Sequence, residues 1–402
     1  MEHSDFLPDD WAVLRQWLPE DLRGLAMQSG FFQRKRGLQD PECWLRLILM
    51  HVSGGLSLKQ TVVRAGELGV AQVSSVALHK RLEKAEDWLA RLTQHVLRQC
   101  WARPVRHEGL RPIRVIDATD IQEPGSTGTF LRLHYSLTLP NLRCDHYEVT
   151  DAKGGEKLGR FSFRRGEIVL ADRGYSHRAG AAGVLAAGAD FVLRWHASVF
   201  PLLQDSRPFS PLAGLRKLRV GEVAEWDATF EQEGRSYPVR LCGLRKSRQA
   251  AAKARRKALD KARRNQTQPD TDSLELTQYV LVLTSLTRQE MPAAKVLEFY
   301  RSRWQVELAF KRLKSLLALG HVPKTNDDTA KAWMQGKVLV ALLIEKILYE
   351  GRFFSPWGYR AQWGESMAML YRSSRHRAPA ALSSIEPEKV AGAGKGNSRR
   401  LG

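Results

Sequence analysis

A fifteen-residue stretch, Tyr300–Lys314 (YRSRWQVELAFKRLK), constrains this chain more than any other segment. On an α-helix, at about 100° per residue, its polar and apolar residues fall on two adjoining faces. The polar face carries one carboxylate, Glu307, in a row with a phenol and three cations: Tyr300, Arg303, Lys311 and Lys314. The apolar face can pack on a core and consists of Val306, Ala309, Phe310, Leu313 and Leu317.

This periodicity supports two interpretations. A carboxylate held among cations on a rigid helix suits a metal ligand whose neighbours bind phosphate. The same pattern is typical of a solvated helix face with several ion pairs. Periodicity alone leaves both open.

Charge and cysteine content narrow the class of protein. The 402 residues include 63 lysines and arginines but 43 acidic residues, a net charge of +20. This excess favours a polyanionic partner, most simply nucleic acid. The four cysteines form no C-x-x-C pair, which argues against a zinc site or a disulfide framework and for a reducing compartment. The acidic start has no signal peptide, and the longest apolar run, Val338–Ile344, is too short to span a bilayer. We therefore expect an intracellular protein with no membrane partner.

The first hundred residues have a helical pattern. Segments 41–52, 58–68 and 75–98 are expected helices, separated by glycine-containing breaks. The order of a helix, a short glycine turn and a second helix is typical of a helix-turn-helix motif, in which Arg64, Lys80 and Arg81 could contact DNA phosphates. A small helical bundle without DNA contacts fits the pattern equally well.

Strand-like segments follow. The first expected strand, Ile113–Ala118, ends near Asp117. A meander follows, and then a strand that ends just before Asp172. The remaining expected elements are the strands Leu131–Leu139, Cys144–Thr150, Ile168–Leu170 and Phe191–Trp195, with a helix at Arg178–Ala187 before the last strand. Three strands in a meander, then strand, helix and strand, predict an α/β fold with an RNase H-like core, a mixed sheet flanked by helices.

A second block of residues is expected to interrupt this core. Val223–Glu231 and Tyr237–Leu244 are expected to pair, with Gly234 in the turn. The next segment, Arg245–Asn265, is dense in alanine, lysine and arginine. It predicts a basic helix that contacts DNA phosphates, with Lys253, Arg255 and Arg256 as candidates, although a plain charged surface helix is the alternative. A flexible loop, 266–273, leads to a returning strand, Tyr279–Leu283, and Ala330–Leu348 forms a final apolar helix.

The candidate metal ligands upstream of the helix are aspartates. Asp117 and Asp172 each follow an apolar strand that we place centrally in the sheet. Asp120 competes with Asp117, and Asp145 and Asp151 are weaker candidates. Any single aspartate at a strand end is commonly a turn or helix cap.

The spacing of the motifs resembles one known family. The pattern Tyr-x2-Arg-x3-Glu-x6-Lys from Tyr300 to Lys314, with the Arg303–Trp304 dipeptide, resembles the signature helix of the DDE transposases of the insertion element four family. The segments Asp117-Ala118-Thr119 and Asp172-Arg173-Gly174-Tyr175 match the two aspartate motifs of that family.

The resemblance implies a mechanism and partners. Asp117, Asp172 and Glu307 would bind two Mg²⁺ or Mn²⁺ ions about 4 Å apart, which activate water and relieve charge on the leaving oxygen. The reaction would be excision of an insertion sequence by hydrolytic nicking, followed by attack of the new 3′-hydroxyl on target DNA. Tyr300, Arg303, Lys311, Lys314 and Arg173 would contact DNA phosphates. The implied partners are double-stranded DNA, as terminal inverted repeats and target, and a second copy of the chain on paired ends, in the cytoplasm at the nucleoid.

Pattern and resemblance together predict five segments: a helical domain binding DNA ends (1–100), a first part of the RNase H-like core (101–196), a β-rich insertion with the basic helix (197–275), a second core part with the signature helix (276–350), and a C-terminal segment with a disordered basic tail (351–402). Two other functions remain open. A nuclease of the same fold would cut DNA without joining it, and a regulator would bind DNA without cutting it.

The basic helix yields a first testable prediction. If it follows DNA phosphates, replacing Lys253, Arg255, Arg256 and Lys257 by alanine removes counterion release at each lost contact. The slope of log affinity against log salt should then fall by about 0.9 per contact relative to the unaltered chain. DNA binding measured across a salt series checks this, and an unchanged slope would show a merely solvated face.

Overall fold

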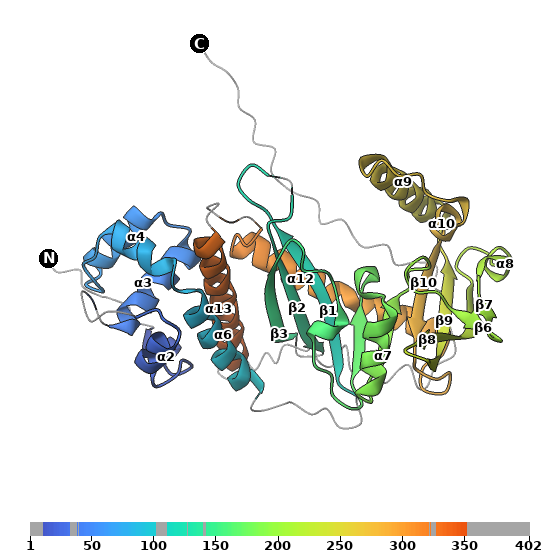
Figure 1. The fold of residues 1–402 in the computed structure, drawn as a ribbon, viewed down its shortest axis with the longest axis horizontal. Coiled ribbons are helices and arrows are strands. Elements are labelled where there is room, and N and C mark those ends of the chain that lie inside the picture. Colours follow the sequence, from blue (N-terminus) through green and yellow to red (C-terminus); the bar gives the residue numbers. More distant parts are fainter. Residues whose placement is uncertain are drawn as a thin grey trace, which may run out of the picture.

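The computed structural model describes residues 11–32, 38, 40–101, 111–126, 128–139, 142–320, 322 and 327–351. The expected basic tail lies outside the described residues, as does most of the 101–112 segment. Within them, one ten-stranded sheet runs through the molecule in the order β3-β2-β1-β4-β5-β10-β9-β8-β6-β7 (Figure 1). Its strands are β1 (Ile113–Ile121), β2 (Leu131–Leu139), β3 (Arg143–Asp151), β4 (Ile168–Ala171), β5 (Asp190–Arg194), β6 (Leu203–Gln204), β7 (Arg207–Pro208), β8 (Val223–Gln232), β9 (Arg235–Arg245) and β10 (Tyr279–Thr284).

The first five strands form the core of the sheet. β1, β2 and β3 are an antiparallel meander, and β4 and β5 continue the sheet parallel to β1. The helix α7 (Arg178–Ala186) connects β4 to β5, as parallel neighbours require. This order and these directions confirm the expected RNase H-like α/β core.

Residues 197–275 extend the sheet rather than only interrupting the core. β8 and β9 form a hairpin whose turn includes Gly234 at φ 73°, and β10 pairs along its whole length with the second half of β9. The helices α9 (Arg248–Arg264) and α10 (Thr271–Leu276) connect β9 to β10 and lie beyond one end of these strands (Figure 1). The prediction of a loop over residues 266–273 is therefore wrong at its C-terminal end. The helix α10 begins there, and Asp270 caps it by accepting a hydrogen bond from the Ser273 N–H.

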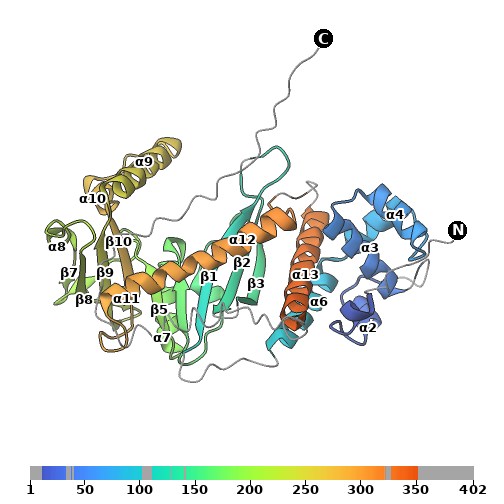
Figure 2. The same ribbon diagram turned by 180° about the vertical axis from the view of Figure 1, so that it is seen from behind.

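Helices cover both faces of the core sheet. On one face α7 packs in an apolar cluster with Ile116, Val169 and Phe191. On the other face a long run of helix crosses the strands, and it lies in front of them in Figure 2. It consists of α11 (Ala293–Tyr300), the 3₁₀ turn η3 (Arg301–Arg303) and α12 (Trp304–Leu316). Val306 and Phe310 of α12 are buried in the cluster that includes Val115 and Leu133.

We expected the signature stretch to form one uninterrupted α-helix, and this expectation is wrong. A 3₁₀ turn follows Tyr300 and the α-helix resumes at Trp304. Side chains at i and i+3 eclipse in a 3₁₀ turn. The turn consequently brings the Arg303 guanidinium over the Tyr300 ring, at 5.9 Å from its centroid. The apolar face itself is confirmed, since Val306, Phe310, Leu313 and Leu317 are all buried.

The N-terminal part is helical, as predicted, with one correction. The expected helix 75–98 is two helices, because the chain turns at Glu83–Ala85 to bury Ala85. Arg81 lies over the rings of Phe31, Phe32 and Trp44 and donates to the Phe31 carbonyl, so this cation holds the helices together. The helices are α1 (Trp11–Arg15), α2 (Leu22–Gln28), α3 (Pro41–Gly54), α4 (Leu58–Glu67), α5 (Ser75–Leu82) and α6 (Glu86–Trp101).

A last helix, α13 (Asp327–Gly351), lies between these helices and the sheet (Figures 1 and 2). One apolar cluster runs from the N-terminal helices through α6 and α13 to β1–β3. The division into five segments stays a prediction. Among the described residues, no helix combines the length and apolar character needed to cross a membrane.

The contact between α13 and α3 generates a stability prediction. A Cβ on Gly336 would lie 3.2 Å from both methyl carbons of Val52, so the two helices approach closely here. Gly336→Leu should overpack this contact and lower the free energy of unfolding by about 1–3 kcal/mol. Chemical denaturation measures the change.

The matched control is Gly66→Leu in α4, where a Cβ meets no atom within 4 Å. Replacing this helical glycine should be neutral or mildly stabilising. Equal stability of the two variants would contradict the close approach of α13 and α3.

Candidate active site

Three polar residues come level at one edge of the sheet because neighbouring strands are parallel. The register pairs Ile116 of β1 with Ala171 of β4, and Ala171 with Leu193 of β5. The next residues along these strands are Asp117, Asp172 and Arg194. The carboxyl ends of parallel strands are where open α/β sheets bind ligands.

We expected Asp117 to lie at the end of its strand, but the strand continues past it. β1 continues to Ile121 because β2 pairs with it along its whole length, while its parallel partner β4 stops at Ala171. Asp117 therefore lies where β1 loses one neighbour. Alternation along the strand places it on the same face as Val115, which is the face that α12 covers.

Asp172 lies where β4 gives way to the 3₁₀ turn η2 (Arg173–Tyr175). Its backbone is extended and its side chain does not cap the turn. Instead, its Oδ1 accepts a hydrogen bond of 3.1 Å from the phenol of Tyr300. The common capping role is thus replaced by a contact with the signature stretch.

Arg303 joins the other two carboxylates. Its Nη1 donates to Asp117 Oδ2 at 3.0 Å, and its Nη2 donates to Glu307 Oε1. The Asp117 side chain is 15% exposed and that of Glu307 57% exposed, so this pair spans from the sheet to the surface of α12. One guanidinium therefore links two carboxylates that are far apart in sequence.

The competing aspartates lie elsewhere. Asp120 pairs with Arg132 at 2.9 Å near the surface. Asp145 is buried against Arg114 at 2.6 Å. Asp151 accepts from the backbone N–H groups of the turn that follows it. None of the three contacts the signature stretch in an interaction that the structure describes, so Asp117 is the stronger candidate.

The environment of Asp117 disfavours its ionised form. Burial raises the pKa of this carboxyl to about 7, against the opposing effects of the Ala118 N–H and Arg303. Repulsion from the like charges of Asp172 and Glu156 contributes to this rise. For Arg303, burial lowers the pKa, but Tyr300, Asp172, Glu307 and Asp117 outweigh this and raise it above its ordinary value. The site therefore favours cations.

Two residues beside the site, Glu156 and Arg194, were not predicted from the sequence. Glu156 lies in the loop after β3, and its carboxylate approaches Gly174 so closely that a Cβ there would meet Glu156 Oε2 at 1.4 Å. Only glycine fits this position without rearrangement. No local pattern marks Glu156, whereas Arg194 had a signal, because it is a cation that ends an apolar strand neighbouring Asp172.

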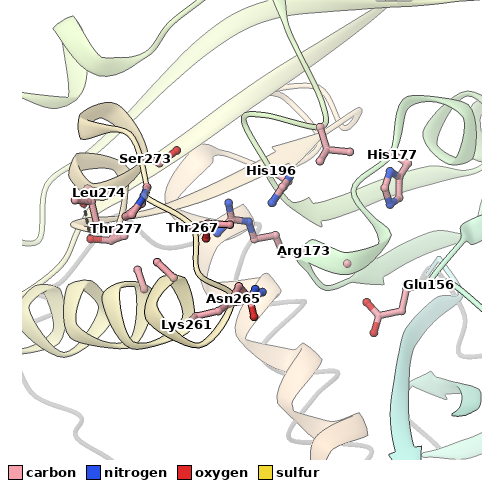
Figure 3. Close-up of a pocket in the computed structure, with 15 residues that line it drawn as sticks. Glu156, Arg173, His177, His196, Lys261, Asn265, Thr267, Ser273, Leu274 and Thr277 are labelled. Carbon is pink, nitrogen blue, oxygen red and sulfur yellow. Dashed lines mark hydrogen bonds between the residues drawn. The ribbon is translucent and has the colours of Figure 1, made fainter. Parts of the chain in front are cut away.

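The remaining candidates do not meet at this cluster. Lys311 and Lys314 are exposed on α12. Lys253, Arg255 and Arg256 are exposed on α9, the helix that follows β9. Arg173 leaves the turn after Asp172 toward a separate cavity (Figure 3).

The donor set can be compared with a divalent ion. Asp117, Asp172 and Glu307 offer only carboxylate oxygens, which suit Mg²⁺ or Mn²⁺ better than zinc. In the part of the chain that the structure describes, no three His, Cys, Asp or Glu side chains lie close enough to hold a metal ion. The Arg303 guanidinium bridges Asp117 and Glu307, so a cation already occupies that position. The ligand chemistry fits, and convergence on a shared metal pair stays a prediction.

Comparisons with known proteins identify the family of this chain. Residues 108–343 match the family model described as a transposase DDE domain. The chain is 34% identical over 357 residues to InsL, assigned as the transposase of insertion sequence element IS186A in Escherichia coli K12, covering 87% of this chain and 96% of InsL. It is also 34% identical to the transposase of IS421 from Escherichia coli, with the same coverage. A transposase of IS231F from Bacillus thuringiensis subsp. israelensis is 21% identical, over 83% of this chain and 78% of that protein. The chain belongs to the family of DDE-domain transposases of insertion elements.

Proposed function

We propose that this DNA transposase cuts and joins DNA with Asp117, Asp172 and Glu307 as its metal-binding carboxylates. The observation that carries the assignment is the pair of bonds from Arg303 to Asp117 and Glu307, since it links the sheet edge to the signature helix. The parallel register then adds Asp172 at the neighbouring position. Each residue comes from a different element, so the cluster exists only in the folded chain.

The family depends on divalent metal ions, and we propose Mg²⁺ or Mn²⁺, two per site. When bound, such ions supply an activated nucleophile and stabilise negative charge on the leaving oxygen. The chain itself keeps the carboxylates in position. Arg303 offsets the repulsion between Asp117 and Glu307, and Tyr300 orients Asp172 through its phenol.

Phosphate binding falls to the cations around this edge. Lys311 and Lys314 are exposed on the helix that carries Glu307, and we assign them to the DNA backbone near the cut. Tyr300 is only 9% exposed, so its role is to hold Asp172 rather than to reach DNA by itself. The exposed cations of α9 would contact DNA farther from the cut.

We further propose that the substrates are the terminal inverted repeats of the element and its target DNA, held by a homodimer on paired ends in the cytoplasm at the nucleoid. The net charge of +20 supports a DNA partner. Hydrolytic nicking would leave a 3′-hydroxyl, which then attacks the target at the same site.

Removing the charge of Glu307 separates binding from chemistry. Glu307→Gln keeps the side-chain volume but removes the carboxylate, so nicking and joining should both fall by about 10³-fold or more while DNA binding survives. The assay uses a supercoiled plasmid that carries the element ends, with Mg²⁺, and scores nicked and joined products separately.

Asp117→Asn and Asp172→Asn should behave like Glu307→Gln, and combining them should add little because the three act as a unit. Asp120→Asn is the matched control and should retain activity. Nicking by Glu307→Gln at the rate of the unaltered chain would end the assignment. If the unaltered chain itself cuts DNA but does not join it to a target, the protein is a nuclease.

Arg303→Ala tests the bridging cation. Without the guanidinium, Asp117 and Glu307 repel each other, so the affinity for Mn²⁺ should rise, while DNA cleavage slows by about 10–100-fold. Mn²⁺ binding by calorimetry and plasmid nicking report the two effects separately. Arg303→Lys is the control that keeps the charge but loses the two-pronged contact. Weaker Mn²⁺ binding in Arg303→Ala would contradict the bridging role.

A further inference from the structure

A cavity of about 580 Å³ lies between the helices α9 and α10 and the turn that follows Asp172 (Figure 3). In Figure 3, Lys261 and Asn265 reach it from α9, Arg173 and His177 from the turn and its continuation, and His196 from the segment after β5. A second cavity of about 280 Å³ shares Arg173, Ala258 and Lys261 with the first. The two form neighbouring compartments beside the active-site edge.

The lining of both compartments is strongly cationic. The cations Arg173 and Lys261 line the first beside two imidazoles, and the second adds the cations Arg194, Lys246 and Lys257. Glu156 is the one acidic residue among the described residues that line either of them. The compartments therefore gather positive charge with little internal compensation.

The protonation behaviour of the lining groups agrees with this crowding. Burial, together with repulsion from Arg173, His177 and Lys261, lowers the pKa of His196 to about 4. Burial likewise lowers the pKa of Lys246 to about 8, with Arg194 adding to the effect. An anion in the compartments would relieve this repulsion.

Size restricts which anion can enter. A volume of about 580 Å³ is within the range of about 300–1,000 Å³ of pockets that enclose small ligands. Duplex DNA does not fit inside this cavity, because the duplex is wider than its major groove, which by itself measures about 12 Å. Separated nucleotides do, and grooves for single strands combine cations for the phosphates with side chains for the bases.

We propose that these two compartments bind the phosphate groups of one or two unpaired nucleotides of the DNA strand next to the cut. The assignment of the strand rests on the proposed function, because Arg173 directly follows Asp172 and so places the compartments beside the reacting phosphodiester. The shared residues Arg173 and Lys261 lie between the compartments, where successive phosphates of one strand would pass. A lone inorganic phosphate would use the same cations but only one compartment.

The test measures binding without catalysis. The full chain, in EDTA, is titrated against a fluorescein-labelled, 5′-phosphorylated trithymidylate, and affinity is read by anisotropy. Lys261→Ala should weaken binding by about tenfold, because a charge-assisted contact is lost. Lys217→Ala is the matched control, since Lys217 is exposed, lines neither compartment and has no assigned role in DNA binding. Its effect should stay within about twofold.

A second pair of variants changes volume and not charge. Ala258→Phe fills the space that both compartments share and should also cost about tenfold, whereas Ala252→Phe, on the exposed side of α9, should cost little. Circular dichroism confirms folding of each variant. If Ala258→Phe fails to fold, the two lysine variants decide the question alone.

Three results would overturn the proposal. Equal losses in Lys261→Ala and Lys217→Ala would show unspecific attraction to surface cations. Inorganic phosphate that binds as tightly as the trinucleotide would show a site for free anions. A short blunt duplex that competes as well as the trinucleotide would show binding outside the compartments. Glu307→Gln should bind the trinucleotide normally, so failure of the metal-site assignment and failure of this proposal remain distinguishable.

Discussion

The arrangement of the active-site edge depends on one guanidinium. Arg303 is held over the Tyr300 ring by the 3₁₀ turn, and it donates to Asp117 on the sheet and to Glu307 on the following helix. Burial disfavours the ionised form of Asp117 and raises its pKa, with repulsion from Asp172 and Glu156 adding to the effect, and the Arg303 guanidinium opposes this rise. The bridge holds the carboxylates near each other until a divalent cation can take over.

The sheet supplies the rigid frame for this bridge. β1, β4 and β5 are parallel neighbours in fixed register, so Asp117, Asp172 and Arg194 come level without any loop having to fold around a ligand. The same sheet then continues through β10, β9 and β8, which carries α9 and α10 to the edge beside Asp172. The inserted segment thus becomes part of the site's surroundings, and this continuity gives a basic helix a defined position relative to the reacting carboxylates.

Much of the core could be predicted from local patterns. Alternation in Leu131–Leu139 and the apolar run of Ile168–Leu170 match strands of the sheet almost residue for residue, because side-chain periodicity is a local consequence of strand geometry. Boundaries failed where a distant partner decides them. β1 continues past Asp117 because β2 pairs with it, and the helix expected over residues 75–98 breaks so that Ala85 can be buried.

The sequence by itself determined the family, the basic character and the spacing that singles out Asp117, Asp172 and Glu307, because motif spacing and composition are properties of the chain alone. Only the tertiary structure decided which groups touch. Arg303 bridges two carboxylates, Tyr300 holds the third, and Glu156 enters beside Gly174, all through contacts between elements far apart in sequence. Such contacts depend on strand register and on the 3₁₀ turn, which set the positions of side chains to within a few ångströms. Neither produces a periodic pattern in the sequence.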